Sequence, residues 1–143
     1  MNQAEDKYTT LQPEELWHIY ANVEAIFRGA GSGSSPKLVG TKGPSARHLD
    51  IIYDPVECVE VVVPNLTKGL SFSGSVERLQ RLNIGGAVWK LPRGAILPKG
   101  LVFNYREIDH PLLNAGVRMS VVEFSAKTLV LAKQMVFTGI RIR

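Results

Sequence analysis

The chain has 143 residues, 45% of them hydrophobic, which suits one domain with its own core and is too short for two. A formal net charge of +4 without long runs of Lys or Arg, together with only 8% aromatic residues, argues against dense phosphate tracking along a nucleic acid. The same net positive charge is compatible with binding of a nucleotide-sized anion. The single cysteine, Cys58, excludes an internal disulfide or a multi-cysteine metal site, and we expect it to be buried.

Membrane and export signals are absent from the sequence pattern. No apolar run approaches the about 18 residues that a membrane-spanning helix needs, and no charged, apolar and small-residue leader opens the chain. We therefore expect a soluble protein without membrane partners, which leaves its cell, if at all, without a cleaved signal peptide.

The first third of the chain predicts an arm, a helix, a strand and a loop. Residues 1–12 are polar and predict a flexible arm, so the folded domain is expected over 13–143. Pro13 and the two Glu after it predict a helix to about Asn22, followed by a strand over Val23–Arg28. Residues 29–43 are rich in Gly and Ser and predict a flexible loop. An alternative is that their backbone N–H groups approach a phosphate, although neither a P-loop nor a dinucleotide fingerprint is present.

The next segment carries several polar candidates. Arg47 precedes a short apolar strand that would anchor it, as a phosphate-binding guanidinium requires. Ser71 and Ser73 flank Phe72 where an apolar run ends, which predicts that both hydroxyls stand exposed at the rim of a sheet. Ser75 predicts the N-cap of a short helix. Around these candidates we expect a strand over Val56–Val63 and a helix over Val76–Leu82 with Leu79 and Leu82 in the core.

The last third predicts more strands and one helix. Short strands are expected over Ala87–Leu91, Ala95–Leu97 and Leu101–Arg106. Residues 108–116 predict a loop, with His110 as a bystander or a loop anchor. Alternation over Val117–Phe124 predicts a strand whose phase places Glu123 with the apolar residues. Glu123 is therefore either at the strand end or in a costly setting, and this conflict makes it a site candidate. From Ser125 we expect a helix to about Met135 and a terminal strand, or else two strands broken at Gly139.

Many short strands without regular βαβ alternation predict a compact single α+β domain, with mostly antiparallel split β-sheets and short flanking helices. In this fold class, Arg28 ends an early strand, the Ser71–Ser73 segment ends a middle strand, and Glu123 lies late in the chain. The order R, S-x-S, E resembles the arrangement of the NAD site in the ADP-ribosyltransferase superfamily.

The chemistry of NAD cleavage gives each residue type a reason. Breaking the nicotinamide–ribose bond produces an oxocarbenium-like sugar, which a carboxylate stabilises. Arg binds a diphosphate by paired hydrogen bonds, Ser hydroxyls hold the sugar, and an aromatic ring such as Phe72 can stack on nicotinamide.

A closer resemblance comes from three short runs. They are A-R-H-L-D-I from Ala46, G-L-S-F from Gly69 and W-K-L-P-R-G-A-I-L-P from Trp89. In this order, and with an early aromatic-Arg strand, the chain resembles the Tse-two-like family of small type VI secretion toxins over roughly residues 25 to 130. The resemblance implies an ADP-ribosyltransferase-like fold with NAD as substrate. It also implies action in the target-cell cytoplasm, a cognate immunity protein and a secretion-apparatus or adaptor component as partners.

Residue by residue, Arg47 and Ser71 match family positions linked to toxicity, and Arg28 matches the early strand Arg. Arg118 stands where the family has a functional His. An Arg can bind phosphate but is not a general base at neutral pH, so Glu123 becomes our candidate for the carboxylate. The expected site therefore has Ser71, Arg118 and Glu123 in catalysis and Arg28, Arg47, Ser71, Phe72 and Ser73 in NAD binding, with no metal.

Three functions follow as hypotheses. The leading one is an NAD-consuming toxin, either an ADP-ribosyltransferase acting on an unknown macromolecule or a glycohydrolase. The alternative is a non-catalytic module whose basic face binds RNA or an acidic protein. The third is a structural β-rich domain with its glycine-rich loop as a linker.

Overall fold

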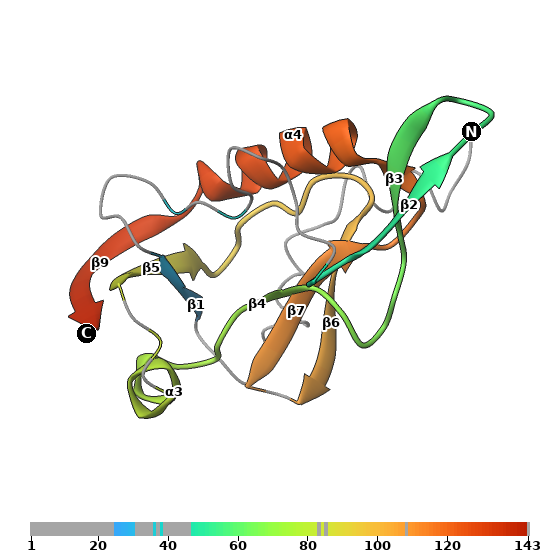
Figure 1. Ribbon diagram of the computed structural model, residues 1–143. Coiled ribbons are helices and arrows are strands. Elements are labelled where there is room, and N and C mark those ends of the chain that lie inside the picture. Colours follow the sequence, from blue (N-terminus) through green and yellow to red (C-terminus); the bar gives the residue numbers. More distant parts are fainter. Residues whose placement is uncertain are drawn as a thin grey trace.

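A computed structural model describes residues 25–30, 36, 38, 47–82, 84, 86–107 and 109–142. The expected arm over 1–12, the helix over 13–22 and most of the loop over 29–43 lie outside these residues. Within the described part, short antiparallel strands are combined with two helices (Figure 1), which confirms the expected α+β class with mostly antiparallel sheets.

The strands form three small antiparallel sheets of three strands each. The first has the order β1-β5-β9, with β1 over Ala25–Ala30, β5 over Gly86–Pro92 and β9 over Val136–Ile142. The second has the order β2-β3-β8, with β2 over Asp50–Asp54, β3 over Val59–Val63 and β8 over Met119–Ser120. The third has the order β4-β7-β6, with β4 over Leu70–Ser71, β7 over His110–Ala115 and β6 over Leu101–Glu107.

A single backbone bridge joins the first sheet to the third. The N–H of Phe27 in β1 donates to the carbonyl of Ser73 at 2.8 Å, and the N–H of Ser73 donates back to the carbonyl of Phe27 at 2.7 Å. This reciprocal pair is a short antiparallel contact in which β1 continues the edge of the third sheet. It brings Arg28, the next residue of β1, beside Ser71.

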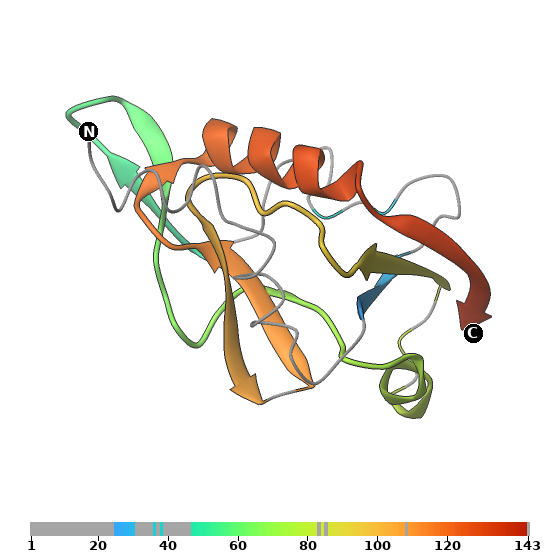
Figure 2. The same ribbon diagram turned by 180° about the vertical axis from the view of Figure 1, so that it is seen from behind.

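Two helices flank the sheets. Helix α3 covers Val76–Arg81, and the Ser75 hydroxyl accepts a hydrogen bond from the N–H of Arg78, which confirms the predicted cap. Leu79 is buried as expected, but Leu82 is exposed, because the helix ends before it could turn that side chain to the core. The second helix, α4, covers Val121–Ala132 and runs along one side of the molecule in both ribbon views (Figures 1 and 2).

The start of α4 corrects one expectation. The residues expected as a strand over 117–124 form only the two-residue β8, because the hydroxyl of Ser120 accepts from the N–H of Glu123 and begins the helix. The helix thus starts before Ser125 and ends at Ala132, and the terminal strand β9 follows as expected. Phe124, Thr128 and Leu131 form its buried face.

Further expectations were wrong. Within the loop expected over 108–116, residues 110–115 form the strand β7 at the centre of the third sheet, with residues 111–115 all buried. Residues 95–97 are not a strand, because Gln134 binds both backbone polar groups of Ile96, at 2.8 Å each, and replaces a strand partner. Residues 56–58 belong to the turn before β3, where Cys58 is exposed, rather than buried, at φ 57°.

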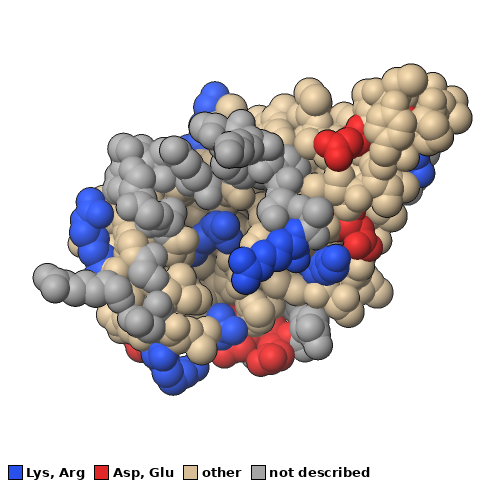
Figure 3. Space-filling model, in the orientation of Figure 1, with Lys and Arg blue, Asp and Glu red and all other residues tan. Residues whose placement is uncertain are grey.

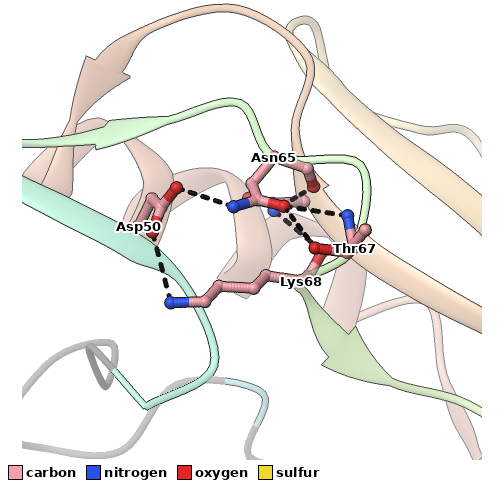
Figure 4. Close-up of polar contacts among 5 residues, drawn as sticks. Asp50, Asn65, Thr67 and Lys68 are labelled. Atoms are coloured by element: carbon pink, nitrogen blue, oxygen red, sulfur yellow. Dashed lines mark hydrogen bonds and ion pairs between the residues drawn. The ribbon is translucent and has the colours of Figure 1, made fainter.

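A polar network fixes the loop between β3 and β4. Asp50 accepts from Asn65 Nδ2 at 2.7 Å and from Lys68 Nζ at 3.2 Å, and Asn65 Oδ1 also accepts from Thr67 (Figure 4). From the other side, the fully buried Asn114 donates through Nδ2 to the carbonyls of Asn65 and Lys68. The network therefore holds β4 at a fixed place between the second sheet and β7.

The core is one cluster of buried apolar side chains shared by all three sheets and α4. Its largest fully buried members are Phe72, Phe124, Leu49, Leu91, Leu101, Leu113 and Leu131. Phe72 follows β4 directly, so the segment that carries the serines is fastened to the core by its aromatic residue.

Candidate functional site

The candidate site forms where β1 meets the end of β4. Arg28, from β1, donates through Nη1 to the carbonyl oxygen of Ser71 at 2.7 Å, and its guanidinium carbon lies 5.8 Å from the centre of the Phe72 ring. The side chain thus crosses from the first sheet to the third and rests on an aromatic face. Sequence reasoning named these three residues, and the structure brings them together.

The position of Arg28 is electrostatically unfavourable for a cation. Burial lowers the pKa of its guanidinium, because desolvation disfavours the charged form. Its Nε atom is buried and has no hydrogen-bond partner among the described residues. An arginine stays charged in proteins, so a half-buried, incompletely paired guanidinium gains more than a solvated one from an anion placed beside it.

Ser71 has a partner that the sequence did not reveal. Its Oγ lies 2.7 Å from Nε2 of His110, the first residue of β7. The contact follows from the pairing of β4 with β7, in which Ser71 is opposite Leu112 and His110 lies two residues earlier on the same face. When Nε2 carries no proton, the serine hydroxyl donates to it. His110 can then accept the proton of the Ser71 hydroxyl, or accept a proton that the hydroxyl relays from another group.

The other two residues of the Ser-Phe-Ser segment face inward. Phe72 is 1% exposed and packs edge-on against Phe103 with ring centres 5.3 Å apart. The Arg28 guanidinium lies over the Phe72 ring, so the ring supports Arg28 and is not open to solvent. Ser73 is fully buried, and its hydroxyl donates to the carbonyl of Ser75 at 2.8 Å. Of the two hydroxyls expected at the rim of a sheet, only that of Ser71 is exposed.

Three expected site residues lie on other elements. Arg47 is exposed in the turn that leads into β2. Arg118, the residue before β8, pairs with Asp54, the last residue of β2, through Nη2 and Oδ2 at 2.6 Å. Glu123 lies exposed in the first turn of α4 and pairs with Lys127 at 2.6 Å, which explains it as a helix-start acid with an i,i+4 partner.

The surface around the site is basic. Lys and Arg side chains gather in the middle of the face drawn in Figure 3, over the region where Figure 1 shows β4 and the beginning of β2. Acidic side chains lie mostly toward the margins of this face. A negatively charged ligand that approaches this region therefore meets a favourable potential before it contacts any particular residue.

Among the described residues, no group of three or more His, Cys, Asp and Glu side chains is placed to hold a metal ion. The same part of the chain contains no helix with the length and apolar character needed to cross a membrane.

Comparisons with protein-family models, with curated proteins and with solved structures found no match for this chain. The functional proposal below is therefore carried by the geometry of Arg28, Ser71 and His110 and by the motifs of the sequence.

Proposed function

We propose that this chain is an NAD-consuming enzyme of the ADP-ribosyltransferase type, with its site at Arg28, Ser71 and His110. One observation carries the proposal. A desolvated guanidinium from the first sheet and a serine–histidine pair from the third sheet meet around a single residue, Ser71, through contacts of 2.7 Å on its carbonyl and 2.7 Å on its hydroxyl. A cation and a polarised hydroxyl side by side fit a ligand that has both a phosphate and a sugar.

Each group has a place in the reaction. The Arg28 guanidinium binds the diphosphate of NAD, which offsets the desolvation of its charge. The Ser71 hydroxyl, held by His110, hydrogen-bonds a hydroxyl of the nicotinamide ribose and fixes the orientation of the sugar. The nicotinamide–ribose bond then breaks, and its electron pair leaves with nicotinamide. Water or an acceptor nucleophile attacks the anomeric carbon, and its proton passes through the Ser71 hydroxyl to Nε2 of His110.

The proposed roles differ from the expected ones at Arg118, Glu123 and Phe72, and Arg47 and Ser73 are not part of the proposed site. Glu123 and Arg118 are engaged with Lys127 and Asp54, so we assign the polarising role to His110 and leave both outside the reacting group. Phe72 acts beneath the site, as the surface on which Arg28 rests, rather than as a stacking partner of nicotinamide.

In its biological setting, we propose a cytotoxic effector that acts in the cytoplasm of a target cell, as the resemblance to the Tse-two-like toxins implies. Consumption of NAD, or transfer of ADP-ribose to a macromolecule, supplies the toxicity. A cognate immunity protein then protects the producing cell, and a secretion-apparatus or adaptor component delivers the toxin.

The test measures nicotinamide release from NAD by mass spectrometry, with thermal shift by NAD against matched ATP as the binding readout. Ser71→Ala and Arg28→Lys are compared with Ser125→Ala and Arg141→Lys, which change the same residue types on α4 and β9. We expect release and the NAD-specific shift from the wild type and both controls, and loss of release in the two site variants. Absence of release from the wild type, or equal release from all variants, contradicts the proposal. Salt-sensitive RNA binding without NAD dependence would favour the binding module instead.

A further inference from the structure

The hairpin formed by β2 and β3 is the most distinct surface feature outside the proposed site. Its four-residue turn, Pro55–Cys58, joins two strands in continuous antiparallel register from Asp50↔Val63 to Asp54↔Val59. In both ribbon views the hairpin extends away from the rest of the molecule, on the side opposite the C-terminal strand β9 (Figures 1 and 2). This placement makes it accessible to another macromolecule.

Contacts at both ends fasten the hairpin. At its base, Asp50 binds Asn65 and Lys68, and β3 pairs with β8 through Val61 and Val62; beside the turn, Asp54 binds Arg118. Hydrogen bonds from the N–H groups of residues 56 and 57 to the Asp54 carboxylate shape the turn. The hairpin is therefore presented as a preformed element, which lowers the entropic cost of binding to it.

The distal half of the hairpin exposes large apolar side chains. Ile52 is 47% exposed, Tyr53 60% and Val56 89%, and Val59 beside the turn is also exposed. Contiguous exposed apolar residues of this kind mark interaction surfaces on proteins. Among the described residues, β2 is also an edge strand with a strand partner on one side only. Its sequence, D-I-I-Y-D, contains neither the Lys nor the Pro that commonly protects an edge.

The charge of the hairpin indicates which kind of partner would bind it. The hairpin, residues 50–63, has four acidic residues and no Lys or Arg, so its formal charge is −4. The remaining residues carry a formal charge of +8, which gives the chain its net charge of +4. Asp50, at the base, is paired with Lys68 and Asp54, beside the turn, with Arg118, whereas Glu57 and Glu60 lie exposed in the distal half. Pairing β2 with β2 of a second copy would bring two such hairpins together and is opposed by like charge.

We propose that the β2–β3 hairpin is a docking element for a protein partner that adds a basic, extended segment to the edge of β2 that no other described strand pairs with. The partner segment would alternate apolar side chains, which cover Ile52 and Val59 on one face, with Lys or Arg side chains, which lie beside Tyr53 and Glu60 on the other face. Strand addition supplies the backbone hydrogen bonds, and the alternating side chains supply the specificity. This inference is independent of the proposed NAD site and holds whether or not the chain is an enzyme.

The test uses the full chain with a fluorophore on Cys58, its only cysteine, which lies exposed in the hairpin turn. The probes are an extended peptide of alternating Lys and Val and a matched peptide of alternating Glu and Val. We expect a saturable fluorescence change with the Lys-Val peptide at least about tenfold tighter than with the Glu-Val peptide, and a marked weakening at about 0.5 M salt.

Variants locate the site of binding. Tyr53→Lys and Val56→Lys are each expected to weaken the Lys-Val peptide at least about tenfold. Leu129→Lys, on α4 and 56% exposed, is the matched control and is expected to leave binding unchanged. Val56 lies in the turn outside the strand ladder, so its variant remains informative if Tyr53→Lys does not fold. Equal affinity for both peptides, no effect of either hairpin variant, or concentration-dependent self-association without peptide would each overturn the proposal.

Discussion

Replacing Arg28 by Met separates function from stability at the proposed site. The substitution removes the hydrogen bond from Nη1 to the Ser71 carbonyl and the contact of the guanidinium with the Phe72 ring. A hydrogen bond to a charged group contributes about 2 kcal/mol and a partly buried cation–π contact about 1 kcal/mol. Met also removes a desolvated charge and a buried, unpaired Nε, and both removals stabilise the folded protein and offset this loss. An unsatisfied buried donor alone costs about 2 kcal/mol.

These terms nearly cancel, so we expect Arg28→Met to change the free energy of unfolding by no more than about 1 kcal/mol. For a chain of this length, that is a shift in melting temperature of about 3 °C. The loss of a phosphate-binding cation, by contrast, should lower NAD turnover at least about 100-fold, equivalent to about 2.7 kcal/mol of transition-state stabilisation.

The assay pairs thermal unfolding with nicotinamide release on the same preparations, and Arg141→Met serves as the control because Arg141 also lies over an aromatic ring, that of Phe137. A fall of more than about 10 °C in melting temperature would show that Arg28 is a structural cation. Full turnover in a stable Arg28→Met variant would refute its role in binding the diphosphate.

Three further substitutions test how β4 and the hairpin are held. Gly69→Ala should cost about 3 kcal/mol or more in chemical unfolding, because its Cβ would lie 2.8 Å from Leu112 Cβ, whereas Gly139→Ala, with a positive φ but open space, should cost about 1–2 kcal/mol; equal losses would contradict this. Asn114→Ala should cost about 2 kcal/mol, because it removes the donor to the Lys68 carbonyl and one of the donors to the Asn65 carbonyl, which Asn104 still reaches, and an unchanged unfolding midpoint would contradict the network. Asn65 and Lys68 hold the pKa of Asp50 below its ordinary value, so the stabilisation is complete above about pH 4 and is lost as pH falls through the folded pKa. Asp50→Asn should therefore flatten the fall in stability below pH 4, and an unchanged acid profile would exclude this contribution.

The elements whose signals are local could be predicted from the sequence. Ser75 caps α3 as expected, because an N-cap needs only one side chain and a nearby N–H group. Strands β5, β6 and β9 lie where β-branched and apolar runs placed them. The α+β class followed from the many short strands without βαβ alternation.

One error arose where a tertiary contact overrides local preference, and another where a local helix cap was not recognised. Pro111 and Asn114 favour a loop, yet Asn114 satisfies its amide on two carbonyls of a distant loop, and β7 becomes a central strand. Alternation over 117–124 resembled a strand, but the single hydroxyl of Ser120 begins a helix. Because β7 was predicted as a loop, His110 had no predicted neighbour. Residues 110–115 show no period-2 alternation, because 111–115 are all buried, so no periodic signal in the sequence placed His110 opposite β4.

The site was predictable only in part for the same reason. Arg28 and Ser71 were named from their order in the chain, and their contact depends on the Phe27–Ser73 bridge, a long-range pairing that no local pattern encodes. Ser73 and Phe72 could not be assigned to the interior from sequence alone, since the direction of each side chain is set by the register of that bridge.

The most direct test of the central claim is calorimetric titration of NAD into the wild type and into His110→Gln, together with nicotinamide release by both. The Gln side chain can still hydrogen-bond the Ser71 hydroxyl but cannot exchange a proton near neutral pH. We predict that both proteins bind NAD within about threefold of each other and that the variant releases nicotinamide at least about 100-fold more slowly. Absence of NAD binding to the wild type, or equal release by both proteins, would contradict the claim that Arg28, Ser71 and His110 form an NAD-consuming site.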